Sequence, residues 1–179
     1  MRGLLAFAGM VDRLTESIGQ AVKWLVLFAS VISAGNAMMR YGLRMSSNAW
    51  LEIQWYLFGA MFLLAAGYAL KYEEHVRVDV LYSRMTPRQQ AWVDVFGHIF
   101  ALLPCALLIT WMSWGMVANS FRINEMSNDA GGLLRWPIKI MVPLGFALLF
   151  VQGVAELIKK IAFLQGLREA GPAYQRPVQ

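Results

Sequence analysis

The stretch Ile53–Leu70, IQWYLFGAMFLLAAGYAL, decides the class of this chain, because it contains no charged side chain. An α-helix crosses the hydrocarbon core of a bilayer with about 20 predominantly apolar residues. The apolar side chains would surround such a helix on every side instead of forming one stripe, so lipid or other membrane helices must cover them. This stretch therefore predicts a membrane-spanning helix.

Three further stretches predict spanning helices, and hydrophobic residues make up 58% of the 179-residue chain while charged residues make up only 15%. A water-soluble core of this size could not bury so much apolar surface. We therefore expect an all-α integral membrane protein that forms a single membrane domain. Its four transmembrane helices are expected at about residues 21–40, 49–70, 92–121 and 137–158.

The amino-terminal residues 1–19 repeat apolar side chains at the spacing of an amphipathic helix, at Leu4, Phe7, Val11, Leu14 and Ile18. We expect this segment to be retained and not cleaved as a signal peptide, because it is long and contains acidic side chains. The carboxyl-terminal residues 165–179 are expected to form a cytoplasmic tail.

Small residues recur every fourth position in the first span, at Ala29, Ser33 and Ala37. This spacing would allow a close approach by another helix, although small residues that face lipid explain it equally well.

The connection between the second and third spans is the most polar part of the chain. Residues 72–86 could form an amphipathic helix in the membrane interface, or a solvated loop that ends at Pro87. His75 lies next to Glu74, but a single exposed histidine is usually neither a metal ligand nor a pH sensor.

The distribution of lysine and arginine predicts the orientation of the helices, because cytoplasmic loops carry an excess of both. Eleven of the sixteen basic residues lie at the two ends of the chain and in the middle connection. Both termini and the middle connection are therefore expected in the cytoplasm. The opposite face carries the other five, which are Arg40, Arg44, Arg122, Arg135 and Lys139.

Charges at the ends of the spans suggest structural pairs. Arg40 closes the first span and Glu52 opens the second, so an ion pair between them is plausible. Gln152 and Glu156 share one face of the fourth span, and Lys159 and Lys160 beyond them are expected to extend toward the lipid headgroups.

Several function classes find no support in the sequence. Cys105 is the only cysteine and His98 is the only histidine within a span, which excludes a thiolate metal site and a bis-histidine haem site. The basic residues are spread along the connections, so nucleic acid is not an expected partner. No catalytic motif appears, and we expect neither an enzyme nor a cofactor in this chain.

Four stretches carry a resemblance that runs from about Gly35 to Lys160. They are NAMMRY (Asn36–Tyr41), WLEIQWYLF (Trp50–Phe58), EHVRVDVLY (Glu74–Tyr82) and DAGGLLRWPIK (Asp129–Lys139). Together they resemble the DctQ family, the small membrane subunits of tripartite ATP-independent periplasmic (TRAP) transporters. Many members carry two adjacent acidic residues where this chain has Glu52 followed by Ile53.

The resemblance implies a scaffold in the inner membrane of a bacterium or archaeon. Its implied partners are membrane lipids, a large TRAP membrane subunit that binds sodium and substrate, and a periplasmic substrate-binding protein. The transported solute would be an organic acid or a related small molecule. The alternatives are an independent homo-oligomeric transporter or channel, and a membrane enzyme. The candidate contact residues are Arg40, Trp50, Glu52, Trp55, Glu74, His75, Arg77, Asp79, Arg122, Glu125, Asp129 and Arg135.

Overall fold

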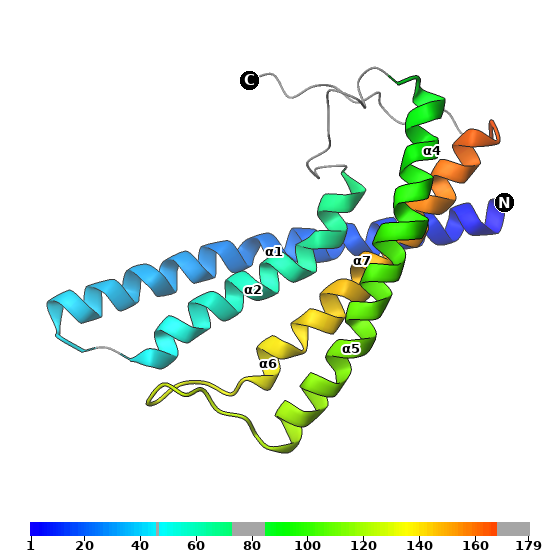
Figure 1. Cartoon of the computed structure of the whole chain (residues 1–179). Helices are drawn as coiled ribbons and strands as arrows, with labels where there is room; N and C mark the ends of the chain where they lie inside the picture. Colours follow the sequence, from blue (N-terminus) through cyan, green and yellow to red (C-terminus); the bar gives the residue numbers. More distant parts are fainter. Residues whose placement is uncertain (46, 73–84, 168–179) are drawn as a thin grey trace.

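The computed structural model describes residues 1–45, 47–72 and 85–167, and nearly all of them are helical. Four helical segments in these ranges are long and apolar enough to cross a membrane, which confirms the predicted class of all-α membrane protein. Figure 1 shows how the helices are arranged. Their bounds are Arg2–Gly42 for α1, Asn48–Lys71 for α2, Pro87–Gly97 for α4, Leu103–Arg122 for α5, Trp136–Lys139 for α6 and Met141–Leu164 for α7.

The third spanning segment is a continuous helix that contains α4, a π-helical turn and α5. It begins earlier than the sequence suggested, because Thr86 and Gln89 form a reciprocal capping box and Pro87 occupies the first turn. Pro104 does not break the helix. The π-helical turn His98–Leu102 directly precedes α5, and such a turn accommodates the carbonyl that proline leaves without its usual donor.

Helix α1 is a single unbroken helix of 41 residues, about 60 Å long at 1.5 Å per residue. The sequence separated an amphipathic segment from the first span near residue 20, and the helix is continuous across this position. Figure 1 shows α1 and α2 lying side by side, and α7 lies between α2 and α5.

Five of the six buried residues of α1 recur at seven-residue intervals, and all six form what we call the inner seam. A strict seven-residue repeat is typical of helices that pack in a left-handed supercoil. Ser33 and Ala37 are exposed, so the expected contact at every fourth residue is not made within this chain. The inner seam consists of Ala8, Val11, Thr15, Val22, Ala29 and Asn36.

Helices α2 and α7 approach each other closely through glycine. A side-chain carbon added at Gly145 would lie 2.6 Å from the carbonyl oxygen of Leu63, closer than van der Waals contact allows. A side-chain carbon added at Gly67 of α2 would lie 3.6 Å from the carbonyl oxygen of Leu148, which is ordinary van der Waals contact. Small residues at such crossings allow the close backbone packing that holds membrane helices together.

Candidate functional site

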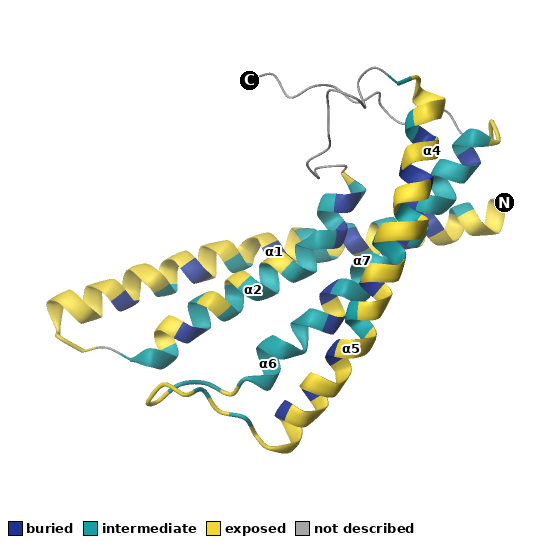
Figure 2. Cartoon of the chain, viewed as in Figure 1, coloured by how far each residue is buried: buried dark blue, intermediate teal, exposed yellow. Residues whose placement is uncertain are grey.

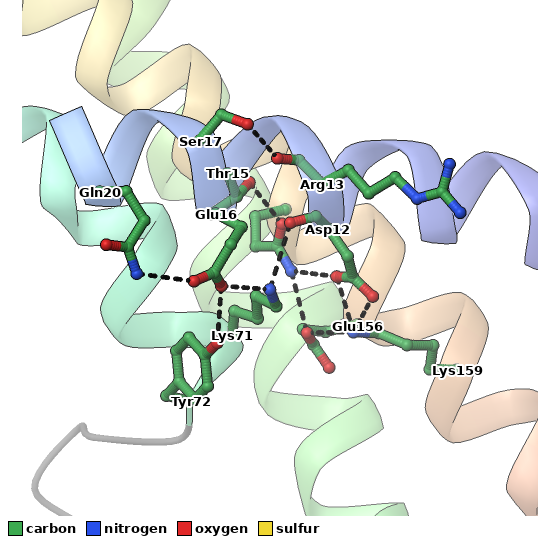
Figure 3. Close-up of polar contacts among 11 residues, drawn as sticks. Asp12, Arg13, Thr15, Glu16, Ser17, Gln20, Lys71, Tyr72, Glu156 and Lys159 are labelled. Atoms are coloured by element: carbon green, nitrogen blue, oxygen red, sulfur yellow. Dashed lines mark hydrogen bonds and ion pairs between the residues drawn. The ribbon is translucent and has the colours of Figure 1, made fainter.

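The most extensive polar site joins the amino-terminal half of α1 to α7, and we call its residues Asp12, Thr15, Gln152, Glu156 and Lys159 the Asp12 cluster (Figure 3). Gln152 is fully buried. Its carboxamide oxygen accepts a hydrogen bond from Thr15 at 2.7 Å, and its nitrogen donates to Asp12 at 2.9 Å and to Glu156 at 3.0 Å. The Lys159 ammonium donates to Asp12 at 3.0 Å and to Glu156 at 2.5 Å.

Helix α2 is joined to α1 next to this cluster. The Lys71 ammonium donates to Glu16 at 2.6 Å and to the backbone oxygen of Asp12 at 3.2 Å. The Tyr72 hydroxyl, just beyond the end of α2, donates to Glu16 at 2.6 Å, and this bond raises the pKa of Tyr72. Asp12, Thr15 and Glu16 of the amino-terminal segment therefore point toward α2 and α7 (Figure 3).

A third contact joins α4 to α7, where Lys160 lies 2.7 Å from the carboxylate of Asp94. We expected Lys159 and Lys160 to extend toward lipid headgroups, and this expectation was wrong. Both ammonium groups bind carboxylates of this chain, because Asp12, Asp94 and Glu156 converge on the last turns of α7. Pairing of this kind offsets the desolvation of charges near a membrane.

A second polar site lies at the start of α2, and we call Glu52, Ser127, Leu133 and Arg135 the Glu52 clamp. The Glu52 side chain is buried, and its carboxylate accepts the backbone N–H of Leu133 at 2.6 Å and the hydroxyl of Ser127. Arg135 lies 3.8 Å from the same carboxylate and 5.2 Å above the ring of Trp55. Glu52 thus binds the 123–135 connection and not Arg40, so the expected Arg40–Glu52 pair was wrong.

Further bonds fasten the 123–135 connection to α2 and α6. Asn48 and Tyr56 donate to the backbone oxygens of Ala130 and Leu134, at 3.0 and 2.8 Å. Lys139 forms an ion pair with Glu125, and this hydrogen bond lowers the pKa of that carboxyl.

The same connection reverses the direction of the chain. Met126 and Leu134 form an isolated antiparallel bridge. Gly131 adopts a φ of 72°, a left-handed conformation that favours glycine. This chain reversal is therefore part of a connection that is fixed to the helices.

The remaining predicted contact residues are distributed over the surface. Trp50 and Trp55 are exposed on the first turns of α2, and Arg40 is exposed near the end of α1. Arg122 is exposed and donates to Asn119 at 2.9 Å, and Asp129 is exposed at the tip of the connection. The other four predicted residues lie outside the described residues, and they are Glu74, His75, Arg77 and Asp79.

Sequence reasoning missed the Asp12 cluster as a site. The signal was present in α7, because Gln152, Glu156 and Lys159 follow one another at helical spacing. A matching face exists in α1, where Asp12 and Thr15 are one turn apart. Among the described residues, no group of three or more His, Cys, Asp or Glu side chains could hold a metal ion. Both polar sites consist of bonds between helices and connections, so their evident effect is to fix the arrangement of the spans.

Comparisons with known proteins identify the family of this chain. A family model described as "Tripartite ATP-independent periplasmic transporters, DctQ component" matches residues 29–163. A Haemophilus influenzae protein named "Putative TRAP transporter small permease protein" is 28% identical over 118 residues, which cover 63% of this chain and 73% of that protein. No solved structure matches. Because the family model covers most of the chain, including all of α2, α5 and the Glu52 clamp, this protein belongs to the DctQ family of small TRAP transporter permease subunits.

Proposed function

We propose that this chain is the fixed scaffold subunit of a sodium-coupled TRAP transporter that imports an organic acid or a related small solute. In this proposal the chain stabilises the large membrane subunit, which carries the sodium and substrate sites. A periplasmic substrate-binding protein delivers the solute, and the chain itself holds no cofactor. The complex lies in the inner membrane, with both termini of this chain in the cytoplasm.

One observation carries the scaffold role: two buried polar side chains of the spans, Gln152 and Glu52, are engaged in bonds within this chain. Gln152, the largest fully buried side chain, uses both ends of its carboxamide to join α1 and α7. Glu52 uses both carboxylate oxygens to hold the 123–135 connection. A transport site needs polar groups that are free to bind a solute, whereas groups engaged in this way stiffen a support.

Reconstitution tests the proposal. The purified chain alone, in liposomes with an inward sodium gradient, should take up no radiolabelled organic acid. Uptake should appear only when the large subunit is co-reconstituted and the loaded binding protein is added. Robust sodium-driven uptake by this chain alone would contradict the scaffold role and would favour the independent transporter.

A second measurement addresses stabilisation separately. The large subunit, purified with and without this chain, should melt at a lower temperature when this chain is missing. If the two preparations melt at the same temperature, the chain does not stabilise the large subunit.

A further inference from the structure

The 123–135 connection is held in shape by bonds that do not involve the Glu52 side chain. The backbone N–H of Ser127 donates to the oxygen of Leu133 at 2.9 Å, and the N–H of Arg135 donates to the oxygen of Glu125 at 2.8 Å. Two side chains of α2 also donate to its backbone oxygens. The connection therefore presents its polar groups to Glu52 from a frame that does not depend on that carboxylate alone. Figure 2 shows the connection at one end of the molecule, beside the start of α2.

Among the described residues, the groups that bind the Glu52 carboxylate are donors. The N–H of Leu133 donates to one carboxylate oxygen at 2.6 Å. The hydroxyl oxygen of Ser127 accepts the N–H of Asp129 at 3.2 Å and the side chain of Arg135 at 3.0 Å, so its own hydrogen is left for the other carboxylate oxygen. The guanidinium of Arg135 adds a positive charge 3.8 Å away. An ionised carboxylate, which only accepts hydrogen bonds, matches such a set of donors.

Gly132 leaves the space that the carboxylate fills. A side-chain carbon at this position would lie 2.9 Å from a carboxylate oxygen of Glu52, closer than van der Waals contact allows. The left-handed backbone belongs to the neighbouring Gly131, so space and not conformation explains the glycine at 132. The Glu52 side chain is only 4% exposed, and the connection therefore encloses the group that it binds.

We propose that Ser127, Gly132, Leu133 and Arg135 form a receptor for a small carboxylate, and that Glu52 is its resident ligand. The order of the 123–135 connection then depends on a bound carboxylate and not on the covalent link to α2. In the wild-type chain the link keeps Glu52 at the receptor at a high effective concentration. The proposal concerns this chain alone and does not depend on the large subunit.

The two hydrogen bonds explain why a carboxylate is preferred to other small ligands. Ser127 and Leu133 bind different oxygens of the same planar group, so the ligand needs two acceptors side by side. A carboxamide of the same shape would turn its NH2 group toward one of these donors and leave that donor without an acceptor. A tetrahedral anion such as sulfate would place further oxygens in the space beside Gly132, where even one added carbon is too close.

Chemical rescue of Glu52→Ala tests the proposal, because acetate has the same heavy atoms as the part of the side chain that this variant lacks. Hydrogen exchange of the 123–135 backbone amides, measured by mass spectrometry, should be faster in Glu52→Ala than in wild type. Acetate at about ten times its Kd should slow this exchange about tenfold, because a ligand that binds only the ordered form acts by a factor of 1 + [L]/Kd. Acetamide, and sulfate at equal ionic strength, are the controls and should leave the exchange fast.

The same rescue should be lost in the double variant Glu52→Ala/Ser127→Ala, which lacks the hydroxyl donor. Exchange that acetate does not slow, or that acetamide or sulfate slows equally, would overturn the proposal. So would full rescue of the double variant.

A second variant tests the receptor in a chain that keeps Glu52, and it decides the matter if Glu52→Ala does not fold. Ser127→Ala should speed exchange of the Leu133 amide about fivefold, the effect of losing one hydrogen bond. Ser127→Thr keeps the hydroxyl and should exchange at nearly the wild-type rate. Equal exchange of the alanine and threonine variants would show that the hydroxyl does not bind the carboxylate, which also overturns the proposal.

Discussion

Replacement of Gln152 by leucine should destabilise the helix arrangement, because leucine has a similar volume and removes only the carboxamide. Three hydrogen bonds are lost, to Thr15, Asp12 and Glu156. Two of them join α1 to α7, and single hydrogen bonds between membrane helices average about 0.6 kcal/mol, so these two contribute about 1 kcal/mol. The buried Thr15 hydroxyl also loses its acceptor, which costs about 1–3 kcal/mol. The expected total is therefore about 2–4 kcal/mol.

For a chain of this length, each kcal/mol lowers the melting temperature by about 2–4 °C, so Gln152→Leu should lower it by about 5–15 °C. Circular dichroism of the purified chain in detergent micelles measures this change. Gln20→Leu, at an exposed position of α1, is the matched control and should change little.

A double-mutant cycle isolates the Thr15–Gln152 bond. Thr15→Val should cost less in the Gln152→Leu background than in the wild type, because the hydroxyl it removes is already unpaired. If Gln152→Leu melts at the same temperature as Gln20→Leu, or if the cycle shows no coupling, the cluster does not hold α1 to α7.

Three further predictions concern the connections. Glu52→Gln should speed hydrogen exchange of the 123–135 backbone amides by about tenfold or more, measured by mass spectrometry, and unchanged exchange would refute the clamp. In a cysteine-free background, a cysteine at Asn128 should react with a membrane-impermeant maleimide in intact cells, whereas one at Ser83 should not, and the reverse pattern would overturn the topology. The folded-state pKa of Glu125 is lowered from 4.5, so its ion pair stabilises the chain above about pH 4.5, and this contribution is lost as the pH falls through the lowered pKa. The difference in melting temperature between wild type and Glu125→Gln should therefore disappear in acid. A difference that persists there would contradict the pairing.

The number and type of the spans could be predicted because they depend on local composition. Ile53–Leu70 needs no partner to be identified as a span, since the absence of charge and the length decide it. The same was not true of the charges at the span ends. Arg40 and Glu52 lie close in sequence and on the same predicted face of the membrane, so they were paired by proximity. The structure instead brings Glu52 to residues 75 to 81 positions away, because the 123–135 connection folds back over the start of α2.

The Asp12 cluster could not be predicted for a related reason. Its bonds join residues up to 147 positions apart, and helical periodicity shows which residues share a face but not which helix that face meets. The amphipathic pattern of residues 1–19 illustrates the difficulty. The structure divides its apolar residues between two faces of α1, with Val11 in the inner seam and Phe7 and Leu14 exposed. One hydrophobic stripe in the sequence thus contains both residues that pack within this chain and residues that this chain leaves exposed.

The way α1 is held also suggests how a small subunit can act as a scaffold. A helix of a scaffold subunit must keep a fixed position against the rest of its own chain, so its packing contact must not slide. The apolar residues of the inner seam resist such sliding only weakly, because small side chains such as Ala8, Val22 and Ala29 interdigitate little with the neighbouring helices. The Asp12 cluster supplies the missing restraint, because displacing α1 by one turn would separate Thr15 from Gln152 and Asp12 from Lys159 at the same time. The polar residues of this chain therefore fix the register of α1 against α7.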